Sequence, residues 1–312
     1  MRRPAVLAAA GASLALAVAL TAAGVGDEAG RLPNWQAFVL GVVQGATELL
    51  PISSSGHLIV VPWLGEWTFL EQNDAFNQTF DVALHLGTLV AVGAYFWRDV
   101  VALVAAWVRS VGRRRIETPD ERVAWIVLVA TLPAAAVGVA FENVIAEHLG
   151  EPWQIAILLA AFALLLWWAD RRPQERRPPD LGLGEGLAIG VAQALALMPG
   201  VSRSGVTITA GRWLGLDRDS AARLSFLLLI PTVLGAVTLE GVGDVLLGDL
   251  PSGWGGPFLV GTLAAAGSGL VAIEALLGYV RRHDYSVFVL YRLLAAAAVL
   301  LLIASGVRAA TF

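Results

Sequence analysis

Six stretches of this chain are each long and apolar enough to cross a lipid bilayer. A spanning helix needs roughly 20 predominantly apolar residues. Runs of about this length lie at about 80–97, 123–142, 153–169, 220–240, 258–280 and 286–306. Of the 312 residues, 57% are hydrophobic and 15% are charged, which is typical of a polytopic membrane protein and not of a soluble domain. The sequence therefore predicts an all-α membrane protein with about six spanning helices.

A further apolar run precedes these spans, from Ala5 to Val25, after Met1-Arg2-Arg3. It is longer than the apolar part of a signal peptide, which usually has about 7–15 residues. This length favours an uncleaved extra helix over a cleaved signal, and a polar linker from Gly26 to Pro33 follows. We therefore predict an N-terminal segment at 1–30 and a single membrane-embedded domain at 31–312.

Two segments, at about 35–60 and 184–210, repeat one another at a constant spacing. Gly41 and Gln44 correspond to Gly190 and Gln193, and the offset (190 − 41 = 149) also relates the Ser- and Gly-rich stretches that follow. An internal repeat in a membrane protein often folds around one shared site. The repeat tips at 41–57 and 190–207 are therefore the predicted centre of function.

Each repeat segment is interrupted near its middle, from Pro51 to Gly56 and from Pro199 to Gly205. Proline stops a helix, and the Ser/Gly run leaves backbone groups without helical partners. Such backbone is stable at membrane depth only inside protein or against a wet cavity. Each segment is therefore predicted to be a re-entrant helix–loop–helix hairpin, whereas the short apolar run at 99–108 is expected to lie along the membrane surface.

The arginines predict the topology, because short Arg-rich loops stay on the cytoplasmic side. Three loops qualify, with Arg109 and Arg113–Arg115, with Arg171, Arg172, Arg176 and Arg177, and with Arg281 and Arg282. The weakly charged links at 143–152 and 241–257 are then expected outside. Tracing the chain between these loops makes the two hairpins enter from opposite faces. This is an inverted-topology repeat, whose tips are expected to meet near the membrane midplane.

The second tip, from Pro199 to Thr207, has the composition of a phosphate cradle. Glycines let backbone N–H groups approach an anion, and a following helix directs its positive end there. Arg203 offers a planar fork that matches two phosphate oxygens. The predicted phosphate-binding residues of this tip are Gly200, Ser202, Arg203, Ser204, Gly205 and Thr207.

The first tip carries reactive groups. His57 suits a nucleophile, a general base or a general acid, and the triplet Ser53, Ser54 and Ser55 precedes it. Gln44 and Glu48 are four residues apart, so they share one helix face. Glu48 is expected either to orient His57 or to hold a divalent cation together with phosphate oxygens.

Predictions also follow for three acidic and basic residues outside the two tips. Asp81 and His85 are expected either to line the entrance of the site or to pair with each other. Glu274 is expected to form a structural pair with Arg292 or Arg223.

The chain has no cysteine and no lysine, which excludes disulfides, thiolate chemistry, a P-loop lysine and Schiff-base chemistry. No basic block suggests a nucleic-acid partner.

At these residues the sequence resembles the undecaprenyl-diphosphate phosphatase family, which is known for bacitracin resistance. The resemblance is carried by Gln44-Gly-Ala-Thr-Glu48, by Pro51-Ile-Ser-Ser-Ser-Gly-His57 and by Pro199-Gly-Val-Ser-Arg-Ser-Gly-Val-Thr207. Similar stretches lie at 80–87, 225–231 and 290–292, so the resemblance covers about 35–306. The apolar segment before residue 30 is extra to the family pattern.

The resemblance implies hydrolysis of undecaprenyl diphosphate to undecaprenyl phosphate and inorganic phosphate, which recycles the lipid carrier of cell-wall synthesis. It also implies a bacterial plasma-membrane enzyme with a site open to the outer face and a supporting divalent cation, Mg²⁺ or Ca²⁺. On this hypothesis Arg203 and a cation held by Glu48 neutralise the phosphates, and Ser54 or His57 attacks the terminal phosphorus. We favour Ser54 as nucleophile, with His57 and Glu48 assisting and with Gln44, Ser53 and Ser55 binding substrate. The expected binding partners of the protein are the polyprenyl diphosphate substrate and membrane lipid. The sequence allows either a monomer or a homo-oligomer.

Two other functions fit parts of the pattern. Inverted repeats with broken helices are common in secondary transporters, where Arg203 would bind a carried anion. The type 2 phosphatidate phosphatases also use Ser-Gly-His and Ser-Arg segments. They need a second histidine soon after the Ser-Arg segment, however, and the next histidine here is His283.

Overall fold

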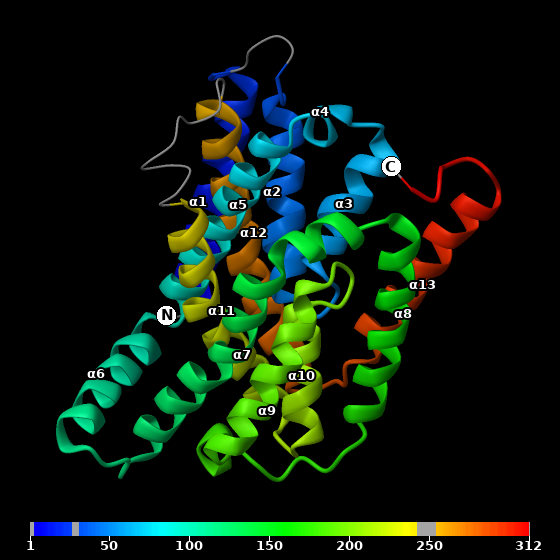
Figure 1. Cartoon of the computed structure of the whole chain (residues 1–312). Helices are drawn as coiled ribbons and strands as arrows, with labels where there is room; N and C mark the ends of the chain where they lie inside the picture. Colours follow the sequence, from blue (N-terminus) through cyan, green and yellow to red (C-terminus); the bar gives the residue numbers. More distant parts are fainter. Residues whose placement is uncertain (1–2, 27–30, 242–253, 312) are drawn as a thin grey trace. The chain divides into compact units, whose positions relative to one another are not determined.

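The computed structural model describes residues 3–26, 31–241 and 254–311, and it forms no strand in these residues beyond one isolated bridge between Arg176 and Leu216. The elements in chain order are α1 (Arg3–Ala22), α2 (Asn34–Leu49), α3 (Ser54–Gly65), α4 (Thr68–Glu71), α5 (Asp74–Tyr95), α6 (Trp97–Arg113), α7 (Pro119–His148), α8 (Pro152–Ala169), η1 (Pro178–Asp180), α9 (Leu183–Ala194), η2 (Leu195–Leu197), α10 (Arg203–Trp213), α11 (Arg218–Gly241), α12 (Gly255–Val280) and α13 (Ser286–Ala304) (Figure 1).

The prediction of an all-α polytopic membrane protein is confirmed. Six helices of the described chain, α1, α7, α8, α11, α12 and α13, are long and apolar enough to cross a membrane, and α5 with α6 forms a seventh candidate. The extra apolar segment at the N-terminus is helical, as predicted. Parts of the predicted linker 26–33 and of the predicted outer link 241–257 lie outside the described residues. The surface location of 99–108, now within α6, stays a prediction.

The chain forms two compact units, each assembled from separated segments. Unit 1 comprises Met1–Leu49, His57–Tyr95 and Val233–Ala275, and unit 2 comprises Leu50–Gly56, Phe96–Thr232 and Leu276–Phe312. The predicted domain boundary at residue 30 stays a prediction. Both predicted hairpins are helix–loop–helix elements, namely α2 with α3 and α9 with α10. Their depth in the membrane stays a prediction.

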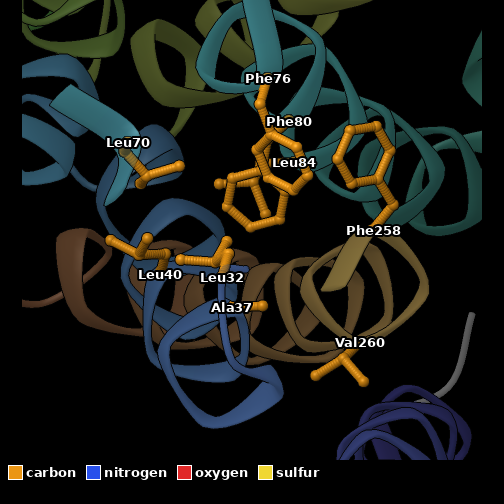
Figure 2. Close-up of a cluster of buried hydrophobic side chains, with 9 residues drawn as sticks. All are labelled: Leu32, Ala37, Leu40, Leu70, Phe76, Phe80, Leu84, Phe258 and Val260. Carbon is orange, nitrogen blue, oxygen red and sulfur yellow. The ribbon is translucent and has the colours of Figure 1, made fainter. Parts of the chain in front are cut away.

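A hydrophobic core cluster of unit 1 is formed by Leu32 together with buried side chains of α2, α4, α5 and α12 (Figure 2). Phe80 is fully buried. Its ring centroid lies 6.1 Å from the ring centroid of Phe76 and 5.6 Å from that of Phe258. Aromatic rings at such separations contribute about 0.5–1.5 kcal/mol per pair beyond the area that they bury. This cluster fixes α5 against the start of α12.

Helix α1 packs against α12 within unit 1. The hydroxyl of Ser13 donates to the carbonyl oxygen of Leu263 at 2.7 Å. The side chain of Leu14 packs directly on Gly267 of α12. A Cβ added at Gly267 would lie only 2.7 Å from this side chain. Arg3 lies 3.2 Å from a carboxylate oxygen of Glu274. The N-terminal helix thus contacts α12 at two levels along its length, at residue 3 and at residues 13–14.

Small residues bring α2 and α12 into close contact. A Cβ on Gly41 would lie 2.4 Å from the carbonyl oxygen of Gly261, and one on Gly45 would lie 2.2 Å from that of Ala265. Two small residues four positions apart let helix backbones approach closely, which is a common way for helices to pack in lipid. The repeat equivalent Gly190 does the same in unit 2, where a Cβ would lie 2.5 Å from the carbonyl oxygen of Ala130.

Replacing Gly41 with alanine should lower the free energy of unfolding by about 1–3 kcal/mol, the usual cost of overpacking a tight contact. Thermal unfolding in detergent measures this. Gly93→Ala on α5 is the control, because nothing lies within 4 Å of its added methyl group. Equal unfolding temperatures for the two variants would contradict the packing described for α2.

Unit 2 is organised around a buried ion-pair network at the end of α8. Asp170 accepts hydrogen bonds from Arg212 Nε at 2.9 Å, from Arg218 Nε at 2.8 Å and from the backbone N–H of Tyr285 at 3.0 Å. Arg212 is fully buried and Asp170 is 6% exposed. The network joins α8, α10, α11 and the start of α13. Its loop 170–172 holds two of the predicted cytoplasmic arginines, and which face it occupies stays a prediction.

Candidate active site

Both broken tips belong to unit 2. The first tip (residues 50–56) runs from the end of α2 into α3, and the second tip (residues 198–207) runs from η2 into α10. The tips contact each other, because the hydroxyl of Ser204 donates to the carbonyl oxygen of Leu50 at 2.9 Å. A Cβ added to Gly56 would lie 3.5 Å from the Cα of Gly200. The two halves of the repeat therefore meet at their interruptions.

The two tips share one unusual backbone conformation, at a serine that precedes each helix. Ser53 and Ser202, which are 149 residues apart, adopt φ angles of 76° and 75°, a left-handed conformation that is uncommon for serine. Each hydroxyl accepts a hydrogen bond from the backbone N–H three residues later, Gly56 at 3.3 Å and Gly205 at 3.0 Å. Each serine thus caps the helix that follows it, α3 or α10. Backbone strain of this kind gathers at functional sites.

Ser54 and Arg203 begin the two capped helices, at equivalent positions of the repeat (203 − 54 = 149). The N-terminus of a helix carries roughly half a positive charge and presents N–H groups, so it binds anions. Unit 2 places two such ends next to each other, since the first turns of both helices belong to contacting tips. This arrangement suits a ligand with more than one anionic group.

Arg203 is half-buried, and its Nη1 donates to the carbonyl oxygen of Ser225 at 2.6 Å. The hydroxyl of Thr207 binds the carbonyl oxygen of Arg203 at 2.8 Å and the hydroxyl of Ser225 at 2.8 Å. Ser225 on α11 therefore fixes both residues. The hydroxyls of Ser204 and Thr207 are engaged within the protein, and their predicted contact with substrate stays a prediction.

Ser54, Ser55 and His57 occupy the first turn of α3, and all three are half-buried. Ser54 and His57 are three residues apart, which places them on one face of the helix. The hydroxyls of Ser53 and Ser55 lie 3.5 Å apart. The candidate nucleophiles are therefore presented by the helix that Ser53 caps.

The acidic part of the predicted site lies on α2 in unit 1. Glu48 is 6% exposed, and one of its oxygens lies 3.8 Å from Nε2 of His85 on α5. The other ring nitrogen of His85 lies 2.8 Å from the carbonyl oxygen of Asp81. His85 thus contacts the backbone of Asp81 and the carboxylate of Glu48, a pairing that the sequence reading did not anticipate.

Gln44 lies one turn before Glu48 and is fully buried. Neither end of its carboxamide has a hydrogen-bond partner within the described residues. A buried amide without hydrogen-bond partners costs about 1–3 kcal/mol of stability. Such groups are rare in folded proteins, and each needs an explanation such as a role in a site. Its repeat equivalent Gln193 donates to the carbonyl oxygen of Ala130 and to the hydroxyl of Thr232, each at 3.2 Å. The carboxamide oxygen of Gln193 also has no partner within the described residues, so the two glutamines differ in their carboxamide nitrogens.

The donor set does not form an all-protein metal cage. In the described part of the chain, no group of three or more His, Cys, Asp or Glu side chains is placed to hold a metal ion. Mg²⁺ is usually bound by one or two carboxylates together with substrate phosphates. A single buried carboxylate such as Glu48 is compatible with this second mode, and its metal role stays a prediction.

Two contacts differ from the sequence-based predictions. Glu274 does not use the predicted partners, because it pairs with Arg3 and accepts a hydrogen bond from the Tyr95 hydroxyl at 3.0 Å. Arg292 instead binds backbone carbonyl oxygens of both tips, including Val201 at 3.0 Å. A charged residue inside an apolar span is itself a signal of function, and this signal could have identified Arg292.

Comparison with known proteins gives a consistent result over most of the chain. A family described as Bacitracin resistance protein BacA matches residues 37–298. The undecaprenyl-diphosphatase of Moorella thermoacetica is 46% identical over 263 residues, which cover 84% of this chain and 95% of that protein. The undecaprenyl-diphosphatase of Thermomicrobium roseum is 47% identical over 283 residues, which cover 88% and 99%. That of Rubrobacter xylanophilus is 44% identical over 266 residues, which cover 85% and 96%.

Proposed function

Because this chain belongs to the bacitracin resistance protein BacA family, we propose that it is an integral membrane phosphatase that hydrolyses undecaprenyl diphosphate. The products are undecaprenyl phosphate and inorganic phosphate. The enzyme thereby recycles the lipid carrier of cell-wall synthesis and gives resistance to bacitracin. The observation that carries the proposal is the contact between two tips that each lead into a serine-capped helix, one of which begins with Arg203.

The diphosphate binds at the two tips, and the prenyl chain lies along apolar helices. Arg203 and the N-terminal N–H groups of α3 and α10 stabilise the phosphate charge. Phosphoryl transfer depends mostly on positioning and charge stabilisation, so these groups supply most of the rate enhancement. Gln44, with its unsatisfied carboxamide, is suited to a hydrogen bond with substrate.

In the chemical step, Ser54 Oγ attacks the terminal phosphorus while His57 takes the hydroxyl proton. The bond between this phosphorus and the bridging oxygen breaks, and undecaprenyl phosphate leaves. Water then attacks the phosphoserine, releases inorganic phosphate and restores the serine hydroxyl. The alternative, in which His57 is itself the nucleophile, gives the same products through a phosphohistidine.

Glu48 would hold a divalent cation, Mg²⁺ or Ca²⁺, together with oxygens of the substrate. Such an ion supplies neutralisation of phosphate charge. His85, 3.8 Å from Glu48, would orient the carboxylate. The enzyme resides in a bacterial plasma membrane, and its site opens to the outer face.

Purified protein in detergent should release phosphate from undecaprenyl diphosphate with added Mg²⁺ or Ca²⁺, and a chelator should reduce this release by at least about tenfold. Without a cation, Arg203 alone would face the negative charges of the diphosphate and of Glu48, and most of this negative charge would stay unbalanced. Folded protein that releases no phosphate with any cation would overturn the proposal. Flux of phosphorylated lipid or anion into liposomes would then indicate a transporter.

Acid quenching during turnover separates the two nucleophiles. A phosphoserine survives acid, whereas a phosphohistidine does not. Phosphate recovered on the peptide that contains Ser54, and absent from a Ser54→Ala variant, is the expected result. Phosphate retained on the protein only under alkaline quenching would assign the attack to His57.

A further inference from the structure

We propose that Arg292 is the positioning residue of this phosphatase, which holds both tips in register through their backbone carbonyl groups. The inference rests on the proposed function for its kinetic part. Arg292 lies on α13, is fully buried, and belongs to unit 2 together with both tips. It does not need to touch substrate in order to act.

The guanidinium of Arg292 joins three segments that are distant in sequence. Nε donates to the carbonyl oxygen of Leu159 on α8 at 3.1 Å. Nη1 donates to that of Pro51 in the first tip at 3.4 Å. Nη2 donates to those of Gly200 and Val201 in the second tip, at 3.2 Å and 3.0 Å. One rigid planar group therefore sets the distance between the tips and fixes both to α8.

These bonds also determine the direction in which the tip amides point. In a trans peptide the C=O and the following N–H point in opposite directions. Because the Val201 carbonyl group points at Arg292, the N–H of Ser202 points away from the guanidinium. Arg292 thus turns carbonyl oxygens, which would repel a phosphate, away from the anion-binding side of the tip.

The charge of Arg292 is not balanced by an acid. Throughout the part of the chain that the structure describes, its hydrogen-bond partners are carbonyl oxygens, and no carboxylate pairs with it. Arg212 is equally buried but is paired with Asp170 at 2.9 Å. A buried charge without a counter-charge is costly, and such groups persist where function requires them. A bound diphosphate would provide the missing counter-charge.

Gly205 shows that the position of the guanidinium is tightly constrained. A Cβ at this residue would lie 2.8 Å from Nη1 of Arg292 and 3.0 Å from Cβ of Ser202. The first turn of α10 therefore rests directly on the guanidinium. Any side chain at Gly205 would have to displace either Arg292 or the cap.

The test compares Arg292→Gln and Arg292→Lys with Arg212→Gln, which removes an equally buried arginine that does not contact the tips. Arg292→Gln should lower kcat by about 100-fold, the cost of a misplacement of about 1 Å, while KM changes less. Arg292→Lys should recover part of this loss, because it keeps the charge and can reach some of the carbonyl oxygens. Arg212→Gln should lower stability but leave kcat per folded molecule within about threefold, since it does not hold the site.

Amide hydrogen exchange gives a readout that does not depend on activity. Arg292→Gln should speed exchange in residues 50–56 and 198–207 and leave residues 212–220 unchanged, whereas Arg212→Gln should do the reverse. If the wild type releases no phosphate but exchange follows this pattern, the proposed function fails and the positioning of the tips stands. Unchanged exchange at both tips together with unchanged kcat in Arg292→Gln would overturn the inference.

A second substitution tests the same contact from the other side. Gly205→Ala should mimic Arg292→Gln, and the double variant should be no slower than the slower single variant, since both disturb one contact. Gly184→Ala on α9 is the control, because nothing lies within 4 Å of its added methyl group. Fully multiplicative effects of the two substitutions would contradict a shared role.

Discussion

Replacing Arg203 with alanine should lower kcat for phosphate release by about 10³–10⁵-fold, the range that arginines contribute when they stabilise a transferring phosphoryl group. The structure explains why no neighbour should compensate. Arg203 is the first residue of α10, and the carbonyl oxygen of Ser225 holds its guanidinium at 2.6 Å. Its charge and the positive end of the helix therefore act at one place, and alanine keeps only the helix.

Lysine at position 203 should retain part of the rate, because it keeps the charge but loses the planar fork. Arg223→Ala is the matched control. This half-exposed arginine on α11 pairs with Asp219 at 2.6 Å, away from both tips, and its loss should change kcat by less than about threefold. Steady-state turnover of folded protein measures all three variants. Turnover of Arg203→Ala within tenfold of the wild type would exclude the proposed scheme.

Replacing Asp170 with asparagine should lower the free energy of unfolding by about 3–5 kcal/mol, the typical cost of removing one partner of a buried ion pair. Arg212 is fully buried, and Asp170 Oδ1 is its carboxylate partner in the network, shared with Arg218. Asparagine keeps a side-chain oxygen but leaves the arginine charge without compensation. Four segments that meet at this point, in α8, α10, α11 and α13, should loosen together.

Unfolding in increasing concentrations of a denaturing detergent measures this effect. Asp219→Asn is the control, because its pairs with Arg223 and Arg281 are partly exposed and such pairs contribute about 0–1 kcal/mol. The double variant Asp170→Leu with Arg212→Met should recover part of the loss, since it removes both charges. A cost below about 1 kcal/mol for Asp170→Asn would show that the network does not hold unit 2 together.

The elements that could be predicted from sequence are those set by local physics. Apolar runs of spanning length gave the long helices, because in lipid a chain must satisfy its backbone within each segment. The prolines and glycines at 51–56 and 199–205 marked the breaks, and the spacing of 149 residues related them. The equal φ angles of Ser53 and Ser202 show that the repeat extends to backbone conformation.

The contacts that escaped prediction join residues far apart in the chain. Arg292 binds Pro51, which is 241 residues away, and no local pattern announces a bond from a side chain to a carbonyl group. Glu274 was expected to pair with arginines of neighbouring helices, yet its partner Arg3 belongs to the N-terminal helix. The positions of charged residues in the sequence do not show which of them pair, because helix packing decides which charges meet.

The packing of α1 on α12 has a consequence for the order in which the protein is made. Ser13 and its acceptor Leu263 are separated by 250 residues, so α1 enters the bilayer long before its partner has been synthesised. Helices insert first and associate afterwards in membranes. Until the ribosome has passed Glu274, Arg3 has no acidic partner on α12 and Gly267 cannot receive Leu14. Unit 1 therefore completes its assembly near the end of translation, and a nascent chain stalled before α12 would have a first helix that lacks its contacts with α12.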